Sequence, residues 1–424
     1  MKRKRVNRLA FSGILATIVL LLCTVYASAQ RNEIYNDRIK SLQVVVNGEW
    51  TKNPPVMKLH SRDELYIGFD DLTHTYHRYI YKVYHCEADW TVSDQIFESD
   101  YLEGFNGNPI EDDAEESLNT TVLYNHYSIF LPNENCSLKM SGNYKLTVMD
   151  EDNDNEKMFT VCFMIVEPLM SSSLSVTPNT DFTVRKNHQQ VDLSLSFGRV
   201  IVSDYSNQLY TVVLQNGRWD NAVLNPKPAF IRRDGLQWTH NKNLIFDAGN
   251  EYLKFEMFDV HRLSLNIDYR RNIEDYYHTF LMANDERRNY VYDEDANGAF
   301  VIRNSDYDDV NRLCDYEFVH YLIRSPRVMG DVYLNGVWTN DQFIDEYKMT
   351  FNPQLDAYEA VVLQKQGYYN YQALVLDRNG TTHPLPSQGN FYETENSYQL
   401  LVYYKGNSDR TWRLVSYTNA DYKP

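Results

Sequence analysis

The sequence predicts an all-β protein built of tandem β-sandwich domains, of the immunoglobulin-like and early-set-like kinds. Short runs that alternate apolar and polar residues, bounded by turn residues, recur along the whole chain. Tyrosine, which packs its ring and keeps its hydroxyl wet on half-exposed strands, occurs 34 times. No stretch has the length and the 3.6-residue period of a substantial amphipathic helix.

The first 29 residues have the pattern of a secretory signal peptide. Several Lys and Arg precede an uncharged apolar run from Leu9 to Tyr26, and Ala27-Ser28-Ala29 forms a small-residue cleavage pattern. The alternative is an uncleaved membrane anchor, because the run is near the lower limit for a spanning helix. Cys23 follows two leucines, which fit a lipidation site poorly. We expect residues 1–29 to be removed on export.

The chain is acidic. It has 41 Lys and Arg against 58 Asp and Glu, a formal net charge of −17. All charged residues of the leader are basic, so its loss makes the net charge more negative. Such a surface repels nucleic-acid phosphates and anionic lipid headgroups. We therefore expect no nucleic-acid partner and no direct membrane insertion.

The strand-like runs divide the exported chain into three stretches. Residues 30–168 are expected to form an N-terminal immunoglobulin-like sandwich, with "SGNYKLTV" and "KMFTVCFMIVE" as its last two strands. After the polar passage "EPLMSSSLSVTPNT", residues 169–325 are expected to form a middle β domain of one or two units. Residues 326–424 are expected to form a C-terminal early-set-like sandwich.

Four cysteines remain after the leader: Cys86, Cys136, Cys162 and Cys314. Export permits disulfides, but the wide and irregular spacing gives neither a zinc knuckle nor a small disulfide framework. The pairing of these cysteines therefore stays open.

The stretch "YHCEADW", Tyr84 to Trp90, groups a histidine, a cysteine and two carboxylates as a reactive site does. Strand alternation places His85 and Cys86 on opposite faces, so they do not meet as base and nucleophile. We interpret Cys86 and Trp90 as packing residues. Asp89 is expected to cap the strand end by accepting bonds from nearby backbone amides.

Three other groups of residues invite a metal or ligand hypothesis. His74 and His77 are spaced for two metal ligands only on a helical turn, and a loop is favoured here. The acidic turns that begin at Asp150 and Asp293 resemble calcium loops, but their twelfth positions hold Val161 and Asn304 instead of glutamate. A looser calcium site stays open at both turns.

The Asn297-Gly298 pair predicts a hairpin between "YVY" and "AFVIR", because these two residues readily adopt positive φ.

The acidic run Glu111 to Glu116 is interpreted as a solvated loop, with a basic partner as the alternative. Trp338, in "GVWTNDQF", is typical of glycan-binding early-set sandwiches, yet sugar recognition needs several converging rings, so packing is favoured.

Several blocks, taken in their order along the chain, resemble the plug protein family of the type IX secretion system of Bacteroidota. One departure is Tyr252-Leu253-Lys254, where a more basic, Phe-containing version is expected. The blocks are "FDDL" (Phe69 to Leu72), "HCEADW" (His85 to Trp90), "YLEGF" (Tyr101 to Phe105), "NTTVLYNHYSIFLPN" (Asn119 to Asn133), "SGNYKLTV", "QNGRWDNAV" (Gln215 to Val223), "KQGYYNYQ" (Lys365 to Gln372) and "YETENSYQLLVYY" (Tyr392 to Tyr404).

The resemblance implies a non-enzymatic periplasmic protein without cofactor, metal or catalytic residues. Proteins of this kind bind the periplasmic mouth of the outer-membrane translocon β-barrel and close its pore when it is idle. The alternatives are an exported glycan-binding β-sandwich protein and a hydrolase. For the hydrolase the sequence offers neither a nucleophile elbow nor an HExxH motif. Which residues contact a partner stays unknown.

Overall fold

The computed structural model describes residues 31–110, 114–305 and 309–424. The predicted leader (1–29) and the first half of the acidic run (111–113) lie outside this part of the chain. Strands make up 50% of the structure and helices only 6%, which confirms the predicted all-β class. The short helices are α2 (Glu98–Tyr101), α3 (Tyr205–Gln208) and α4 (Val310–Leu313), with 3₁₀ turns η1 (Lys242–Leu244), η2 (Val337–Thr339), η3 (Asp345–Tyr347) and η4 (Pro386–Gln388). Within these ranges no helix is long and apolar enough to cross a membrane.

The N-terminal module is a sandwich of two sheets and a small ribbon around one apolar core. The first sheet has the order β1-β12-β11-β5-β7, with β3 beside β12, and comprises β1 (Glu33–Ile34), β3 (Val56–Lys58), β5 (Tyr79–Cys86), β7 (Asn108–Pro109), β11 (Gly142–Asp150) and β12 (Glu156–Val166). The second sheet has the order β2-β4-β9-β8 and comprises β2 (Ile39–Val46), β4 (Leu65–Asp71), β9 (Asn125–Leu131) and β8 (Glu115–Glu116). The ribbon pairs β6 (Leu102–Gly104) with β10 (Cys136–Leu138).

This arrangement is the topology of a constant-type immunoglobulin domain. The order β2-β4-β9-β8 corresponds to strands A-B-E-D, and β5-β11-β12 corresponds to C-F-G. The fold also has a tyrosine corner, because the buried Tyr144 at the start of β11 donates its hydroxyl hydrogen bond to the Met140 carbonyl, 2.7 Å away. The strand order is the one expected of an immunoglobulin-like sandwich, with β11 and β12 as its last two strands. The limits of this domain, residues 30–168, stay a prediction.

The middle module is a second sandwich, made from two separated stretches of the chain. Its core lies between a sheet of order β13-β14-β18-β17, with β19 beside β14, and a sheet of order β16-β15-β30-β31. The strands are β13 (Ser171–Thr177), β14 (His188–Ser196), β15 (Leu209–Gln215), β16 (Arg218–Leu224), β17 (Phe230–Arg232), β18 (Gly235–Trp238), β19 (Ile245–Asp247), β30 (Asn396–Tyr404) and β31 (Arg413–Tyr422).

The inserted module occupies the chain between β19 and β30. Its ten strands form one bent sheet in the order β20-β28-β25-β26-β27-β24-β22-β21, with β23 and β29 also on β28. β26 links the two halves, because Met349 pairs with β25 whereas Thr350 pairs with β27. The strands are β20 (Leu253–Met257), β21 (Ile267–Ile273), β22 (Tyr276–Leu281), β23 (Phe300–Ile302), β24 (Tyr316–Arg324), β25 (Asp331–Asn335), β26 (Lys348–Asn352), β27 (Ala357–Lys365), β28 (Gly367–Leu376) and β29 (Thr382–Pro384).

Strand pairing therefore crosses the boundary expected between residues 325 and 326. β15 pairs with β30 over its full length, and β24 pairs with β27. The stretches 169–325 and 326–424 thus share two sheets, because strands that are distant in sequence pair through backbone hydrogen bonds. The division of the chain into independently folding domains stays a prediction.

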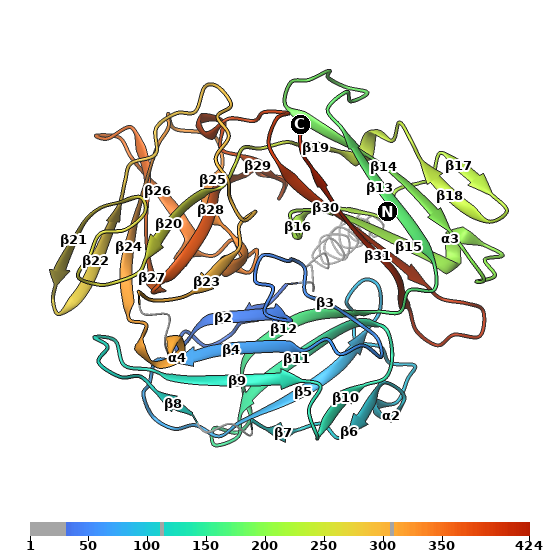
Figure 1. The fold of residues 1–424 in the computed structure, drawn as a ribbon, viewed down its shortest axis with the longest axis horizontal. Helices are drawn as coiled ribbons and strands as arrows, with labels where there is room; N and C mark the ends of the chain where they lie inside the picture. Colours follow the sequence, from blue (N-terminus) through green and yellow to red (C-terminus); the bar gives the residue numbers. More distant parts are fainter. Residues whose placement is uncertain (1–30, 111–113, 306–308) are drawn as a thin grey trace, which may run out of the picture.

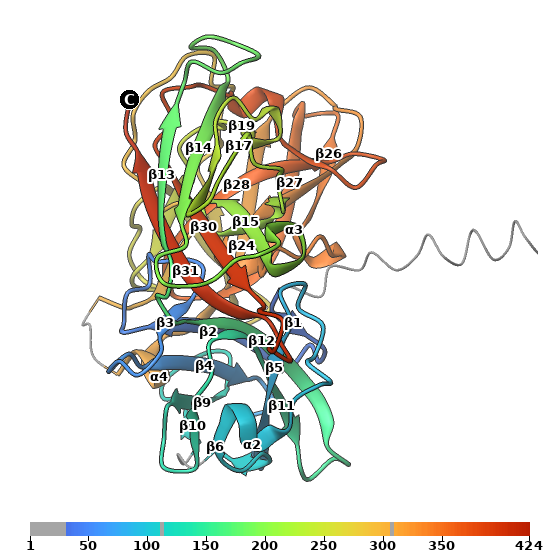
Figure 2. The same ribbon diagram turned by 90° about the vertical axis from the view of Figure 1, so that its right-hand side faces the viewer.

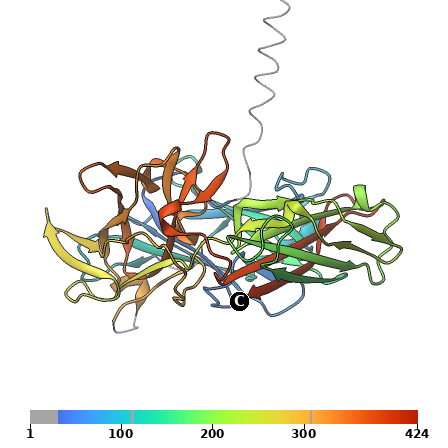
Figure 3. The same cartoon turned by 90° about the horizontal axis from the view of Figure 1, so that it is seen from above.

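The three modules lie at the corners of a triangle when the molecule is seen down its shortest axis (Figure 1). The N-terminal module is at the bottom, the inserted module at the upper left and the middle module at the upper right. Figure 2 shows β31 of the middle module running beside β12 of the N-terminal module, and Glu167 donates its backbone N–H to the Leu414 carbonyl there, at 2.9 Å. Seen from above, the body is broad and flat (Figure 3).

The tyrosine corner yields a stability prediction. Tyr144→Phe leaves the Met140 carbonyl without its donor, so we expect the free energy of unfolding to fall by about 1–3 kcal/mol. Urea unfolding followed by tryptophan fluorescence measures the change. Tyr35→Phe is the control, because this hydroxyl is on a half-exposed ring and its loss is expected to cost within about 0.5 kcal/mol. Equal effects of the two variants would contradict a structural role for the corner.

Candidate functional site at the junctions between modules

His85 and Cys86 lie on opposite faces of β5 and form no reactive pair. The buried His85 ring contacts Tyr144 edge to face at 5.1 Å, and its nitrogens lie 2.9 Å from the Ser93 hydroxyl and 3.2 Å from the Ser141 carbonyl. Burial raises the pKa of the Cys86 thiol to about 12, so the nucleophilic thiolate is not populated at neutral pH. The interpretation of Cys86 as a packing residue agrees with this geometry.

The rest of the "HCEADW" block joins the N-terminal module to the middle module. Trp90 is only 2% exposed and packs edge to face on Trp219, with ring centroids 5.7 Å apart. Glu87 accepts a hydrogen bond of 2.7 Å from the Thr411 hydroxyl and one of 3.2 Å from the Trp412 backbone. Asp89 accepts from the Thr91 amide at 3.0 Å, which confirms the predicted strand-end cap.

Apolar packing completes this first junction. Cys162 and Met164 on β12 lie in one buried cluster with Leu214 and Tyr403 from the middle module. The Tyr403 hydroxyl donates to the Asn143 side chain at 2.8 Å. Large apolar side chains in close contact hold the two modules firmly together, since protein interiors pack at crystal-like density.

The second junction joins the N-terminal and inserted modules through a buried ion pair. The Lys365 ammonium lies 2.7 Å from the Asp70 carboxylate, and both side chains are 1% exposed. The same carboxylate lies 2.6 Å from His126 Nδ1 and accepts from the Tyr316 hydroxyl at 2.7 Å. The ammonium also lies over the Tyr124 ring, 4.0 Å from its centroid.

The groups around Asp70 at the second junction favour its charged form. Burial by itself raises the pKa of a carboxyl group, but the positive charge of Lys365 and the bond from His126 outweigh it, so the pKa of Asp70 lies below its usual value. The Asp70 carboxyl group is therefore ionised at neutral pH. Removal of either partner would leave an uncompensated charge in the interior.

The third junction joins the middle and inserted modules around one guanidinium. The Arg218 side chain makes two bonds to Asp220, at 2.9 and 2.6 Å, and Thr382 of the inserted module donates to the same carboxylate. Asp341 of the inserted module accepts from the Trp219 backbone at 3.3 Å. Burial and then the negative charge of Asp220 raise the pKa of Asp341 to about 6.

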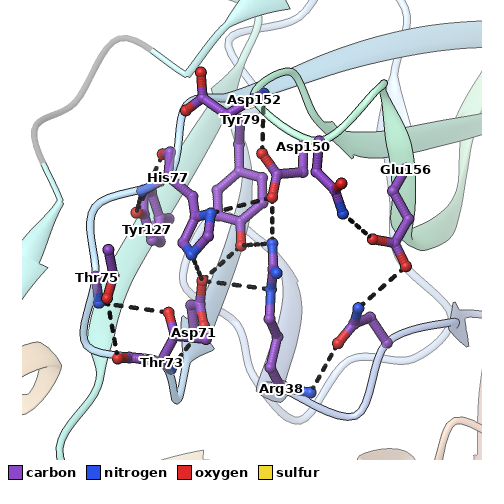
Figure 4. Close-up of polar contacts among 12 residues, drawn as sticks. Arg38, Asp71, Thr73, Thr75, His77, Tyr79, Tyr127, Asp150, Asp152 and Glu156 are labelled. Carbon is purple, nitrogen blue, oxygen red and sulfur yellow. Dashed lines mark hydrogen bonds and ion pairs between the residues drawn. The ribbon is translucent and has the colours of Figure 1, made fainter.

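His77 and Asp150, which the sequence placed in separate hypotheses, meet in one polar network (Figure 4). His77 Nδ1 lies 3.1 Å from the Asp150 carboxylate, and Arg38 donates to that carboxylate at 2.5 Å. Asp71 accepts from the Tyr79 hydroxyl at 2.6 Å. A cation such as calcium would have to displace the Arg38 guanidinium, which already compensates the charge of these carboxylates. His74 lies in a loop with φ of 51°.

The acidic turn at Asp293 is also filled by protein groups. Asp293 binds the Lys254 ammonium at 2.6 Å, and Asp295 accepts from the Asn297 amide at 2.7 Å and from the Tyr252 amide. Burial raises the pKa of Asp295 to about 7. Over the described ranges, no group of three or more His, Cys, Asp or Glu is arranged to hold a metal ion.

The hairpin predicted at Asn297-Gly298 is wrong, because the strand after the turn does not pair with the residues before it. Both residues have positive φ, 50° and 86°, as the turn requires. β23 pairs with β28, however, and residues 290–292 form no strand. The long β28 offers the buried Tyr369 as a neighbour for Phe300, with stacked rings 5.5 Å apart, and this packing decides the pairing.

Two remaining hypotheses concern the surface. Trp338 is 8% exposed and stacks on Tyr321, and its indole donates to the Asn370 carbonyl at 2.9 Å. It is a core residue, as favoured from the sequence, and not a glycan platform. Of the acidic run, Glu115 and Glu116 are exposed on the edge strand β8.

The sequence did not identify the junction residues. Asp70, Lys365 and Arg218 stand in the blocks "FDDL", "KQGYYNYQ" and "QNGRWDNAV". Asp70 and Lys365 pair with each other across two modules, whereas Arg218 pairs with Asp220 of its own strand, which accepts a hydrogen bond from Thr382 of the inserted module. The available signal was the position of charged residues inside strand-like blocks, since a buried charge requires a partner.

These features define a protein of three β-sandwich modules locked edge to edge into one flat body. Residues 39–167 match the family described as the type 9 secretion system plug protein 1st domain. The crystal structure of a hypothetical protein from Parabacteroides merdae is 36% identical, with a TM-score of 0.87, covering 92% of this chain and 99% of that one. The chain belongs to the type IX secretion system plug family.

The other comparisons add little. A trypsin-activated alpha-2-macroglobulin from Escherichia coli is 10% identical with a TM-score of 0.16, covering 89% of this chain and 23% of that one, and this likeness carries no argument. No curated protein sequence matches the chain.

The second junction gives a prediction about stability. Lys365→Met leaves Asp70 charged and buried without its partner, so we expect the free energy of unfolding to fall by about 3–5 kcal/mol. Chemical denaturation measures it, and the double variant Asp70→Asn/Lys365→Met should recover part of the loss. Lys40→Met is the matched control, because the Lys40–Glu346 pair spans the same two modules in a partly exposed setting and is worth under about 1 kcal/mol. A small effect of Lys365→Met would mean that the ion pair does not hold the junction.

The cysteines give a prediction about reactivity. Cys86, Cys136, Cys162 and Cys314 are buried free thiols, and burial raises the pKa of each to about 12. We expect a thiol reagent at about pH 8 to label none of the four in the folded protein and all four in denaturant. Mass spectrometry counts the labels. Loss of mass by paired oxidation, or fast labelling of the folded protein, would contradict this structure.

Proposed function

We propose that this protein is a periplasmic, non-enzymatic plug that binds the periplasmic opening of the type IX secretion outer-membrane barrel and occludes its pore when no cargo is in transit. We further propose that residues 1–29 direct export and are cleaved. The observation that carries the proposal is the flat body of three modules (Figure 3), joined by buried apolar packing at the first junction, a buried ion pair at the second and hydrogen bonds to Asp220 and Asp341 at the third.

The physical requirement is a rigid cover. A barrel wide enough to pass folded cargo leaks small and large solutes when it is idle. A cover that yields at its joints would leak as well, and the modules here meet through Trp90 on Trp219, Asp70 with Lys365, and the Arg218 cluster. These joints support a body that moves as one piece.

Closure of the pore also has to be reversible. A moderate and largely polar interface dissociates more readily than a large apolar one. The acidic balance of the chain, −17 over the whole sequence, supports a polar contact with the barrel and opposes a permanent one.

The proposal is tested by deletion in the cells that make the protein. We expect the outer membrane to become permeable to large antibiotics and dyes, while secretion of cargo continues at least in part. The wild-type gene should restore the barrier. A gene with Trp90→Ala and Trp219→Ala, which opens the first junction, should restore it less well at equal protein level, and one with the exposed Met329→Ser should restore it fully.

A pull-down from native outer membranes provides the physical counterpart. The protein is expected to co-purify with the translocon barrel and to be absent from barrels engaged with cargo. Unchanged permeability on deletion, together with no barrel in the pull-down, would refute the plug function.

A further inference from the structure

The hairpin of β17 and β18 carries an apolar and basic tip at one end of the molecule. Figure 1 places the hairpin at the right-hand end of the longest axis. Phe230 and Ile231 are 57% and 60% exposed, although residues of this type are usually buried. Arg232 and Arg233 follow directly and are exposed, with the exposed Asp234 as the acidic neighbour.

A second turn adds a further positive charge. The backbone N–H of Phe197 donates to the Asp234 carbonyl at 2.9 Å, so the turn that contains the exposed Arg199 lies beside the tip. Three arginines thus lie on two adjacent turns at this end of the sheet, which also carries two exposed apolar side chains. Within the described part of the chain, none of the three arginines forms an ion pair, whereas Arg38, Arg218 and Arg270 each have a carboxylate.

The base of the hairpin is fixed and only its tip is free. Arg232 pairs with Gly235 across the two-residue turn, and a Cβ at Gly235 would lie 2.2 Å from the Leu195 carbonyl oxygen of β14. Because Gly235 has no side chain, β18 pairs closely with β14, and the base of the hairpin is held in place.

We propose that this tip docks on an anionic phospholipid surface, with Phe230 and Ile231 entering the boundary between headgroups and acyl chains and with Arg199, Arg232 and Arg233 contacting phosphates. Apolar side chains beside cationic ones are the pattern of interfacial anchors. A folded partner protein fits less well, because a stable interface needs about 800 Å² on each side and this tip is one narrow turn.

The acidic body does not prevent such docking. At physiological ionic strength the Debye length is about 8 Å, so carboxylates on the other modules are screened from the end of the long axis. The expected repulsion of lipid headgroups therefore holds for the body as a whole and fails at this tip. The inference needs export to the envelope but not the plug activity.

The test is flotation of the purified exported chain with vesicles. We expect binding to phosphatidylethanolamine vesicles that contain phosphatidylglycerol and little binding to pure phosphatidylcholine. Binding should be lost at about 1 M salt, where the Debye length is about 3 Å. Arg232→Gln/Arg233→Gln should weaken binding by roughly 30-fold. Phe230→Ser/Ile231→Ser should weaken it as well, at unchanged thermal unfolding, because both side chains are exposed.

The control variant is Met329→Ser/Arg378→Gln, which alters an exposed methionine and an exposed arginine of the inserted module. It should bind vesicles as the wild type does. The proposal is overturned if the wild type does not bind anionic vesicles, or if the tip variants and the control bind equally. Loss of barrel co-purification in the tip variants, with vesicle binding unchanged, would identify a protein contact instead and also overturn it.

Discussion

The pairing of β15 with β30 is the constraint on which the architecture depends. Seven consecutive residue pairs, from Leu209 with Tyr404 to Gln215 with Tyr398, join strands that stand before and after the whole inserted module. Without this ladder the middle sandwich has no second sheet, and the surfaces that face the other two modules do not exist. The entropy of closing so long a loop grows only slowly with its length, so one well-packed ladder can hold it.

Each junction uses a different balance of forces. Apolar packing dominates between the N-terminal and middle modules, whereas ionised groups dominate at the two junctions with the inserted module. A buried ion pair adds little net stability compared with apolar residues of the same size, but a misplaced partner costs several kcal/mol. The pair of Asp70 with Lys365 and the hydrogen bond from Thr382 to Asp220, a carboxylate held by Arg218, therefore fix which surfaces meet, while Trp90 and its neighbours supply the cohesion.

Local patterns in the sequence predicted what depends on neighbouring residues. Alternation gave the all-β class, the final strands of the first sandwich and the opposite faces of His85 and Cys86, and a short side chain at a strand end gave the cap at Asp89. What depends on distant partners was not predictable. Asn297-Gly298 adopts the expected turn, yet β23 pairs with β28. Across the first junction, the hydrogen bonds of the "HCEADW" block are made with Thr411 and Trp412, more than 300 residues further along the chain.

The interrupted middle sandwich has a consequence for the order of assembly. The chain is made from its amino end, so the N-terminal sandwich and the inserted module can both form while the middle module still lacks β30 and β31. The incomplete sandwich exposes Val213 of β15 and Leu236 of β18, which later belong to one buried core. Folding is thus completed by the last strands to be made, and a chain whose synthesis stops early presents an unfinished apolar surface to proteases and chaperones.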